Sequence, residues 1–379
     1  MTSALFRYFC RITGCHNWRI YAYLPTEIKR NGMESIKLYG LRLAAARRMR
    51  GVSTRELAEM INGAVSAQMI SKYEQGASMP NSMVFMSIAK ALRLPFDYFV
   101  RPFSVKITNV EYHEKKGVSA KELTKAEEAI KDKLERCLEI ESLLAEEKHG
   151  HAPKFDVSCE TDAKAAANKL RDEWGLGRGG WLNIIGSLEE NGIMVVEIEA
   201  DSTFGGQCGM ADGRPFVAVS RSLTAERKRF DILHELGHIV LRFVNDHHRD
   251  VESLCDAFAN EMLISDETLR KEIGEKRKDI SLEELRGIQR SYGISPESLM
   301  EKALSARIIS ENRYRIFRSK MTQPGFATLV NESLFPNESS NRFERMVYRS
   351  LACDIITTSR AAALLHSSVE AVSRQLELV

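Results

Sequence analysis

Two histidines of this chain lie four residues apart, in the run His234-Glu235-Leu236-Gly237-His238. Apolar residues recur at helical spacing from 225 to 243, which predicts one helix over that range. Residues four apart leave the same face of a helix, so both imidazoles can bind a single ion. Glu235 lies beside them, where it could accept a proton from a water molecule that the ion activates. The spacing therefore predicts a zinc site suited to hydrolysis.

A short motif of this kind also occurs by chance, so the prediction depends on a third ligand. Glu252 and Asp256 lie four residues apart on a helix predicted over 250–263. We expect Glu252 to complete a His-His-Glu site whose fourth position stays open to water. Asp256, one turn further on, could hold the free N–H of His234 and fix its tautomer. A third histidine at position 244 would indicate a different ligand set, but that residue is Val244.

Two simpler interpretations compete with a catalytic site. The histidines could be packed core residues, although a pair on one face beside two glutamates argues against this. The site could also hold a structural zinc ion, or bind metal without turnover, because an intact ligand set shows capacity and not a substrate.

A second group of elements lies in front of the metal motif, where five short helices are predicted between residues 38 and 100. A capping box formed by Ser53 and Glu56 begins the second helix, because each side chain satisfies a free backbone N–H. Ser66 is the predicted cap of the third helix, over 67–74. This spacing of short, capped helices predicts a compact helical module.

The succession resembles the lambda-repressor/XRE type of helix-turn-helix. The matching residues are Glu56-Leu57-Ala58, Ile70-Ser71-Lys72-Tyr73-Glu74, Gly76, Pro80 and Ile88-Ala89. The resemblance implies that the start of the third helix enters the major groove of DNA. It would direct Ser66, Gln68, Met69 and Lys72 towards DNA, with Gln68 suited to an adenine edge and Lys72 and Arg55 to phosphates. The connection over 62–65 is longer than is common for this motif, which leaves the base-contacting positions open.

Composition and charge agree with a folded, DNA-binding chain. The 379 residues exceed one usual domain, and 44% hydrophobic with 28% charged residues are typical of globular proteins. No apolar run reaches the roughly 18 residues of a spanning helix, and the seven cysteines stand singly, which favours a reducing cytoplasm. Between residues 33 and 103, ten Lys/Arg oppose five Asp/Glu, and Arg47, Arg48 and Arg50 are expected to face outward. A module that only dimerises is the alternative to DNA binding.

The metal motif is similar to that of the ImmA/IrrE family of metallopeptidases. The similar segments read Phe230-Asp231-Ile232-Leu233-His234-Glu235-Leu236-Gly237-His238 and Glu252-Ser253-Leu254-Cys255-Asp256-Ala257-Phe258-Ala259-Asn260-Glu261-Met262-Leu263. A predicted helix over 181–192, a strand over 193–199 and a hairpin through Asp212-Gly213 into a strand over 216–220 fit the same family. Cys255 stands where alanine is usual, and Ser265 stands where a proline commonly ends the motif.

Because this family often carries an XRE module in front, the resemblance covers most of residues 33–310. It implies cleavage of a repressor protein in response to stress.

The sequence predicts five segments along the chain. Residues 1–32 are expected to be a poorly ordered or misassigned leader, in which Cys10, Cys15 and His16 lack the fourth ligand of a structural zinc site. The other segments are a helix-turn-helix over 33–103, a charged helical linker over 104–150, a metallopeptidase-like domain over 151–270 and a helical extension over 271–379. We expect the apolar seam of the linker to dock on the next domain, with pairing to a second copy of the chain as the alternative. For the last two helices of the extension we favour a docking role over DNA binding or a lid on the peptidase domain.

The predicted fold is α+β and mainly helical, with a five-helix lambda-repressor-like domain and a zincin-like domain that holds a small sheet. We expect a cytoplasmic transcriptional regulator that binds a double-stranded DNA operator, can form a homodimer and has no membrane partner. Its Zn²⁺-dependent endopeptidase domain would cleave a partner repressor or antitoxin. Two alternatives stay open: a transcription factor whose zinc domain senses a ligand or metal without cutting, and an antitoxin-like protein that binds through its tail.

Overall fold

The computed structural model describes residues 32–102, 105–114, 119–145, 152–200, 204–244 and 248–377. The expected leader, with Cys10, Cys15 and His16, therefore lies outside the described residues except for its last residue, Gly32. Contacts divide the chain into two compact units. The first unit gathers Met1–Ser104, Glu127–Glu146 and Phe343–Val379, and the second gathers Val105–Ala126 and Glu147–Arg342. The predicted linker and the predicted extension are each divided between the two units.

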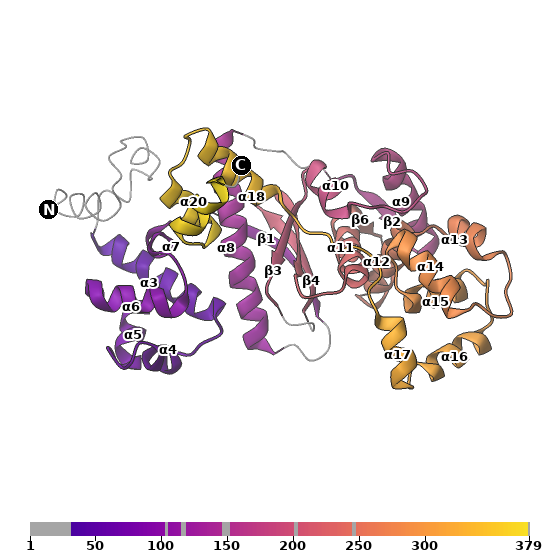
Figure 1. Cartoon of the computed structure of the whole chain (residues 1–379), viewed down its shortest axis with the longest axis horizontal. Helices are drawn as coiled ribbons and strands as arrows, with labels where there is room; N and C mark the ends of the chain where they lie inside the picture. Colours follow the sequence, from indigo (N-terminus) through magenta and orange to yellow (C-terminus); the bar gives the residue numbers. More distant parts are fainter. Residues whose placement is uncertain are drawn as a thin grey trace. The chain divides into compact units, whose positions relative to one another are not determined.

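The first unit contains the predicted five-helix module (Figure 1). Its helices are α3 (Gly32–Met49), α4 (Thr54–Met60), α5 (Ala67–Glu74), α6 (Ser82–Leu92) and α7 (Phe96–Val100). The capping box is present, because Ser53 N–H donates to Glu56 and Glu56 N–H donates to the Ser53 hydroxyl. The Ser66 hydroxyl accepts a hydrogen bond from Met69 N–H at the start of α5. Both predicted caps are confirmed.

Helices α3 and α5 approach closely because Gly40 has no side chain. A Cβ atom at Gly40 would lie 2.5 Å from the carbonyl oxygen of Tyr73. The Arg47 guanidinium then donates two hydrogen bonds to the Glu74 carboxylate, at 2.6 and 2.9 Å. Arg48 pairs with Glu128, and Arg50 donates to backbone carbonyls at the end of α6. Arg48 and Arg50 are exposed, as predicted, whereas Arg47 is partly buried against Glu74 and departs from the prediction.

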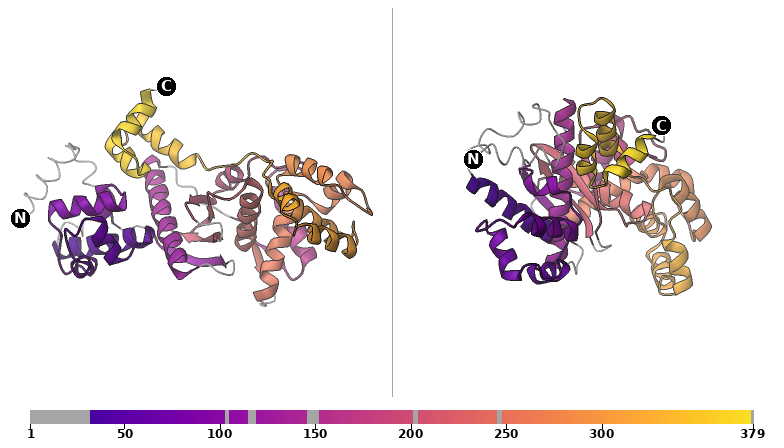
Figure 2. Two further views of the ribbon diagram at one scale, coloured as in Figure 1. Left: turned by 60° about the horizontal axis from the view of Figure 1, so that its bottom comes forward. Right: turned by 60° about the vertical axis from the view of Figure 1, so that its left-hand side comes forward.

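The first unit is completed by the long helix α8 (Ala120–Leu144) from Glu127 onward, and by three helices from the C-terminal end: α18 (Arg342–Ala352), α19 (Thr358–Leu365) and α20 (Val369–Glu377). Figure 2 shows these helices beside α8 in both views. Ile140 of α8 packs in one apolar cluster with Val347, Leu364 and Val372. The apolar seam of the linker is therefore covered by the chain's own C-terminal helices.

Buried charges join α8 to the five-helix module. Arg42, which is 1% exposed, pairs with Glu135 at 2.8 Å, and Arg101 pairs with Asp132 at 2.7 Å. Two of the ten basic residues counted towards a DNA-binding surface are thus buried in ion pairs. The local charge excess is weaker support for DNA binding than the sequence suggested.

A four-stranded sheet lies in the second unit, with strand order β1-β4-β5-β3. Its strands are β1 (Ile107–Glu114), β3 (Met194–Ile198), β4 (Phe204–Ala211) and β5 (Arg214–Ser220). Strand β4 runs antiparallel to both of its neighbours, and β3 runs parallel to β5. The predicted hairpin is confirmed: Asp212 and Gly213 join β4 to β5 with φ angles of 48° and 81°.

Strand β1 is a departure from the helical linker predicted over 104–150. Residues 107–114 pair along β4, and only residues 120–144 of that segment form a helix. The alternation around Val110, Glu111 and Tyr112 is the period-two signal that indicates a strand. The charge density of the segment obscured it.

Helices surround the metal motif in the second unit. They are α9 (Glu160–Glu173), α10 (Ile184–Glu190), α11 (Ala225–Val240), α12 (His248–Leu263), α13 (Asp266–Ile273), α14 (Leu282–Tyr292), α15 (Pro296–Ser305), α16 (Glu311–Lys320) and α17 (Pro324–Asn331). The helix predicted over 225–243 ends three residues early, because Leu241–Phe243 form strand β6 parallel to β2 (Phe155–Val157). The core of this unit lies between the sheet, α11, α12 and α9. None of the helices in the described ranges is both long and apolar enough to cross a membrane.

Candidate metal centre

Helices α11 and α12 cross closely at the metal motif. A Cβ atom at Gly237 would lie 3.2 Å from Sγ of Cys255, so a larger residue at position 237 would push the helices apart. Phe258 and Leu236 are fully buried in the same core and hold the crossing. Glu252 lies almost one turn before Cys255, so the crossing brings its carboxylate over the two histidines.

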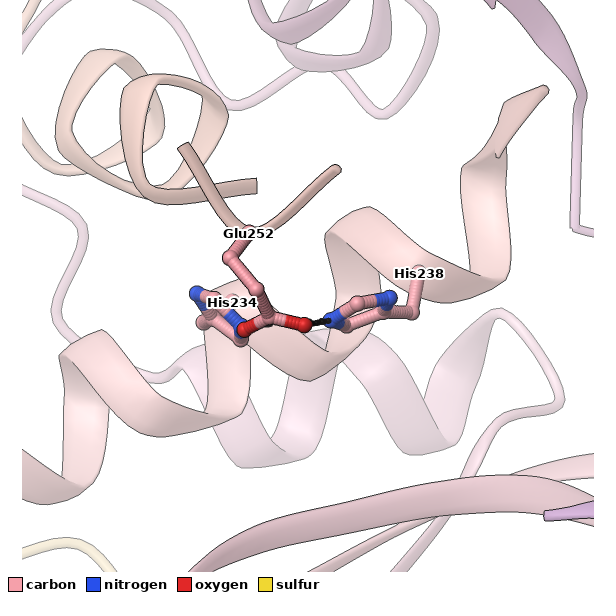
Figure 3. A group of neighbouring side chains, drawn as sticks. All are labelled: His234, His238 and Glu252. Carbon is pink, nitrogen blue, oxygen red and sulfur yellow. Dashed lines mark hydrogen bonds and ion pairs between the residues drawn. The ribbon is translucent and has the colours of Figure 1, made fainter. Parts of the chain in front are cut away.

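Three side chains converge at this crossing (Figure 3). Nε2 of His234 and Nε2 of His238 lie 3.2 Å apart. Oε2 of Glu252 lies 3.2 Å from Nε2 of His234, and Oε1 lies 3.6 Å from Nε2 of His238. One ligand atom from each residue falls within 4.8 Å of the others. Figure 3 shows the two imidazoles on α11 and the carboxylate reaching them from α12.

Asp256 lies behind the first of these histidines. Its Oδ1 is 2.8 Å from Nδ1 of His234, on the side of the ring that faces away from Glu252. Burial of His234 opposes a positive charge, but hydrogen bonds to Asp256 and Glu252 outweigh it and raise the pKa of His234 to about 9. A carboxylate in this position leaves Nε2 free to bind an ion.

Glu235 follows His234 on α11 and lies beneath strand β4. A Cβ atom at Gly206 would lie 2.7 Å from Oε1 of Glu235, so the strand passes directly over the carboxylate. Glu235 is 1% exposed, and within the described residues its Oε1 has no hydrogen-bond partner. Burial raises the pKa of Glu235 to about 8, against the opposing effects of His234 and of a hydrogen bond with Cys208. A buried carboxylate with an unsatisfied oxygen is suited to exchanging a proton.

A segment that the sequence did not connect with the site holds α11 in place. Glu226 accepts hydrogen bonds from the N–H groups of Leu334 and Phe335, at 2.9 and 3.2 Å. Lys228, which is 1% exposed, donates to Glu197 of β3 at 2.9 Å and to the carbonyl of Glu338 at 3.1 Å. Charged residues in the first turns of α11 therefore bind residues 333–340, although a helical charge run usually marks a solvated face.

The residues predicted to contact DNA belong to the first unit and lie around α5. Ser66, Gln68 and Lys72 are exposed, as is Arg55 on α4. Met69 is different, because it is partly buried against the core of the five-helix module. Four of the five side chains are therefore accessible, and Met69 is in large part a packing residue.

The donor set fits the ion that the motif implies. Two imidazole nitrogens and one carboxylate oxygen are ligands that zinc binds in catalytic sites, with one position left for another ligand. The structure brings together His234, His238 and Glu252, places Asp256 behind them and Glu235 beside them. Gly206, Gly237 and the buried charges of α11 were missed by the sequence analysis, because their roles depend on partners distant in the chain.

Comparison with known families gives two matches. Residues 188–304 match the family described as IrrE N-terminal-like domain, a peptidase family, and they contain the whole metal motif. Residues 43–99 match the helix-turn-helix family. No curated protein matches the chain. The predicted fusion is confirmed: this chain joins an XRE-type helix-turn-helix domain to an IrrE/ImmA-like domain of the metallopeptidase class.

Proposed function

We propose that this chain is a DNA-binding regulator whose second unit is a zinc-dependent endopeptidase that cleaves a partner repressor or antitoxin. The convergence of His234, His238 and Glu252 beside the buried Glu235 carries the proposal. A bound zinc ion would supply Lewis acidity towards a water molecule and a peptide carbonyl. His234, His238 and Glu252 would hold it, with Asp256 fixing the orientation of His234.

Glu235 would carry the proton between the reactants. Its carboxylate would take a proton from the attacking water and deliver it to the nitrogen of the departing amine. Its burial beneath β4 excludes bulk water, which strengthens electrostatic interactions with the reacting groups.

The helix-turn-helix would bring the chain to an operator. Ser66 and Gln68 at the exposed start of α5 would face base edges, while Lys72 and Arg55 would contact phosphates. Cleavage of a repressor bound nearby would then change transcription at that site.

The test compares cells that express the wild-type chain with cells that express Glu235→Gln, which keeps the metal ligands but removes the base. Labelling of new protein N-termini should reveal a partner cut only by the wild type. The same cut should appear with purified proteins, stop with a chelator and return with zinc. If no new N-terminus depends on Glu235, the peptidase proposal is wrong.

The near-complete burial of Glu235 favours one second candidate, a transcription factor whose metal domain senses rather than cuts. In that case Glu235→Gln would leave regulation of a reporter gene intact, whereas Glu252→Gln, which removes a metal ligand, would abolish it. Loss of regulation in both variants would favour the peptidase.

A further inference from the structure

Strand β4 has no open edge. One edge pairs with β5. The other pairs with β1, where Glu111 lies opposite Cys208, Tyr112 opposite Gln207 and His113 opposite Gly206. Strand β1 therefore follows the same stretch of β4 that passes over Glu235.

That stretch is where an extended substrate would have to bind. Because Gly206 touches the Glu235 side chain, a peptide bond within reach of that carboxylate must lie close to residues 206–208 of β4. Extended peptides commonly bind by adding a strand to the edge of a sheet, through backbone hydrogen bonds. Since β5 holds one edge, the outer edge of β4 remains for a substrate, and β1 covers it.

We propose that β1 is an autoinhibitory strand that covers the substrate edge of β4 and must leave before an extended peptide can bind there. This inference rests on the proposed peptidase function. Glu235 itself lies beneath β4 and is 1% exposed, and Cys208 on the covered stretch of β4 is 3% exposed.

Two irregularities in its pairing with β4 make β1 a strand that can be displaced. Its register with β4 shifts between Thr108 and Glu111 and again between His113 and Glu114, so only residues 111–113 pair without interruption. A bulge leaves the extra residue unpaired and locally disrupts the ladder of backbone hydrogen bonds. Strand β1 also lies outside residues 188–304, which match the peptidase family.

The chain connects this cover to the DNA-binding unit. Strand β1 is followed in sequence by α8, whose residues from Glu127 onward belong to the first unit. Strand β1 and the first unit are therefore close to each other in the sequence.

The first experiment measures whether the edge accepts a strand, without any hydrolysis. In a full-length Glu235→Gln background, residues 107–114 are replaced by a Gly-Ser segment of the same eight-residue length. The probe is a fluorescein-labelled peptide with the sequence Ile-Thr-Asn-Val-Glu-Tyr-His-Glu. We expect its anisotropy to show binding at least about ten-fold tighter to the opened variant than to the parent, since the edge is free. Equal binding to both proteins, or to neither, would overturn the proposal.

The variant with the Gly-Ser segment could fail to fold, so a matched pair of proline variants provides a second test. In the regular stretch 111–113, alternate residues direct their N–H groups towards β4, so only one of Tyr112→Pro and His113→Pro removes a pairing donor. One variant should bind the probe and the other should behave as the parent does. If the two variants behave alike, β1 does not act through its backbone pairing and the proposal is wrong.

Zinc-loaded chains with Glu235 intact then separate this proposal from the peptidase function, with dye-labelled denatured casein as substrate. Faster cleavage by the opened variant supports both. Probe binding without any casein cleavage supports the inhibitory role of β1 and contradicts the peptidase function. Cleavage by the wild type as fast as by the opened variant contradicts the cover alone. Self-cleavage of the wild type within residues 107–114 would also overturn the proposal, because β1 would then be a substrate.

Discussion

Gly206 and Glu235 are in contact where strand β4 packs on helix α11. A Cβ atom on Gly206 would lie 2.7 Å from Oε1 and 2.8 Å from Cγ of Glu235. These residues are 29 positions apart in the sequence (235 minus 206), and neither would reveal the other without the fold. The contact fixes the distance between the sheet and the proposed base.

Gly206→Ala should therefore damage activity more than stability. The added methyl group must displace the Glu235 carboxylate, and a displacement of about 1 Å at a reacting group can reduce the rate about 100-fold. Overpacking should cost about 1–3 kcal/mol of unfolding free energy. The matched control is Gly287→Ala on α14, where nothing lies within 4 Å of the new Cβ atom. Casein cleavage and thermal unfolding measure the two effects; full activity of Gly206→Ala would show that Glu235 is not the base.

Asp256→Asn should weaken metal binding while leaving the three ligands in place. The carboxylate lies 2.8 Å from Nδ1 of His234 and orients its ring, and loss of such a partner typically reduces metal affinity about 10–100-fold. Competition with a zinc-binding dye measures the affinity. Glu267→Gln removes an exposed carboxylate that pairs with Lys271 on its own helix, and it should leave zinc affinity unchanged. An unchanged zinc affinity in Asp256→Asn would contradict the role given to this residue.

Two variants of α5 should separate base reading from phosphate contact. Gln68→Ala should relax preference at one base position by about 1–3 kcal/mol, because a side chain that bonds to a base edge is lost. Lys72→Ala should weaken binding to all DNA sequences. It should also reduce the slope of the logarithm of the binding constant against the logarithm of salt concentration by about one. Lys90→Ala removes an exposed charge from α6 and serves as the control. The measurement is selection of bound DNA sequences, followed by titration of DNA affinity with salt. Equal effects of all three variants would show that α5 is not the helix that contacts the bases.

The first unit should lose stability as the pH falls from 7 to 5, because of His366. Burial lowers the pKa of this imidazole to about 3, and the nearby Arg136 adds to the effect. The unfolded chain takes up the proton near pH 6.5, so the contribution is complete above that pH and is lost as the pH falls towards 3. The loss by pH 5 should be about 2 kcal/mol. The other groups that face the ring are Asp132, Arg101, Arg50 and the ring of Tyr98.

Asp132 does not act in this pH window, because its neighbouring cations hold its pKa below the usual range against the effect of burial, and its contribution is lost only under more acidic conditions. His366→Asn keeps a side chain that tolerates the left-handed backbone at this position, where φ is 51°. Hydrogen exchange of the α19 amides at a series of urea concentrations measures the free energy of unfolding of this unit. The variant should lose clearly less stability between pH 7 and 5 than the wild type, and equal losses would exclude His366 as the cause.

Local patterns in the sequence determined the metal motif, the helices that carry it and the caps of the five-helix module. His234 and His238 share a face because of their spacing, and Ser53 with Glu56 forms a capping box within one turn. Such features depend on residues a few positions apart, so the sequence specifies them directly. The hairpin at Asp212-Gly213 belongs to the same class.

Only the tertiary structure decided which distant elements meet. It brought β1 to the edge of β4, buried Arg42 against Glu135 and laid residues 333–340 across the charged start of α11. A charge run looks the same in sequence whether water or a buried partner satisfies it, and a strand is assigned only when another strand accepts its hydrogen bonds. For that reason the sequence determined the candidate metal ligands, while the fold decided which elements pack around them.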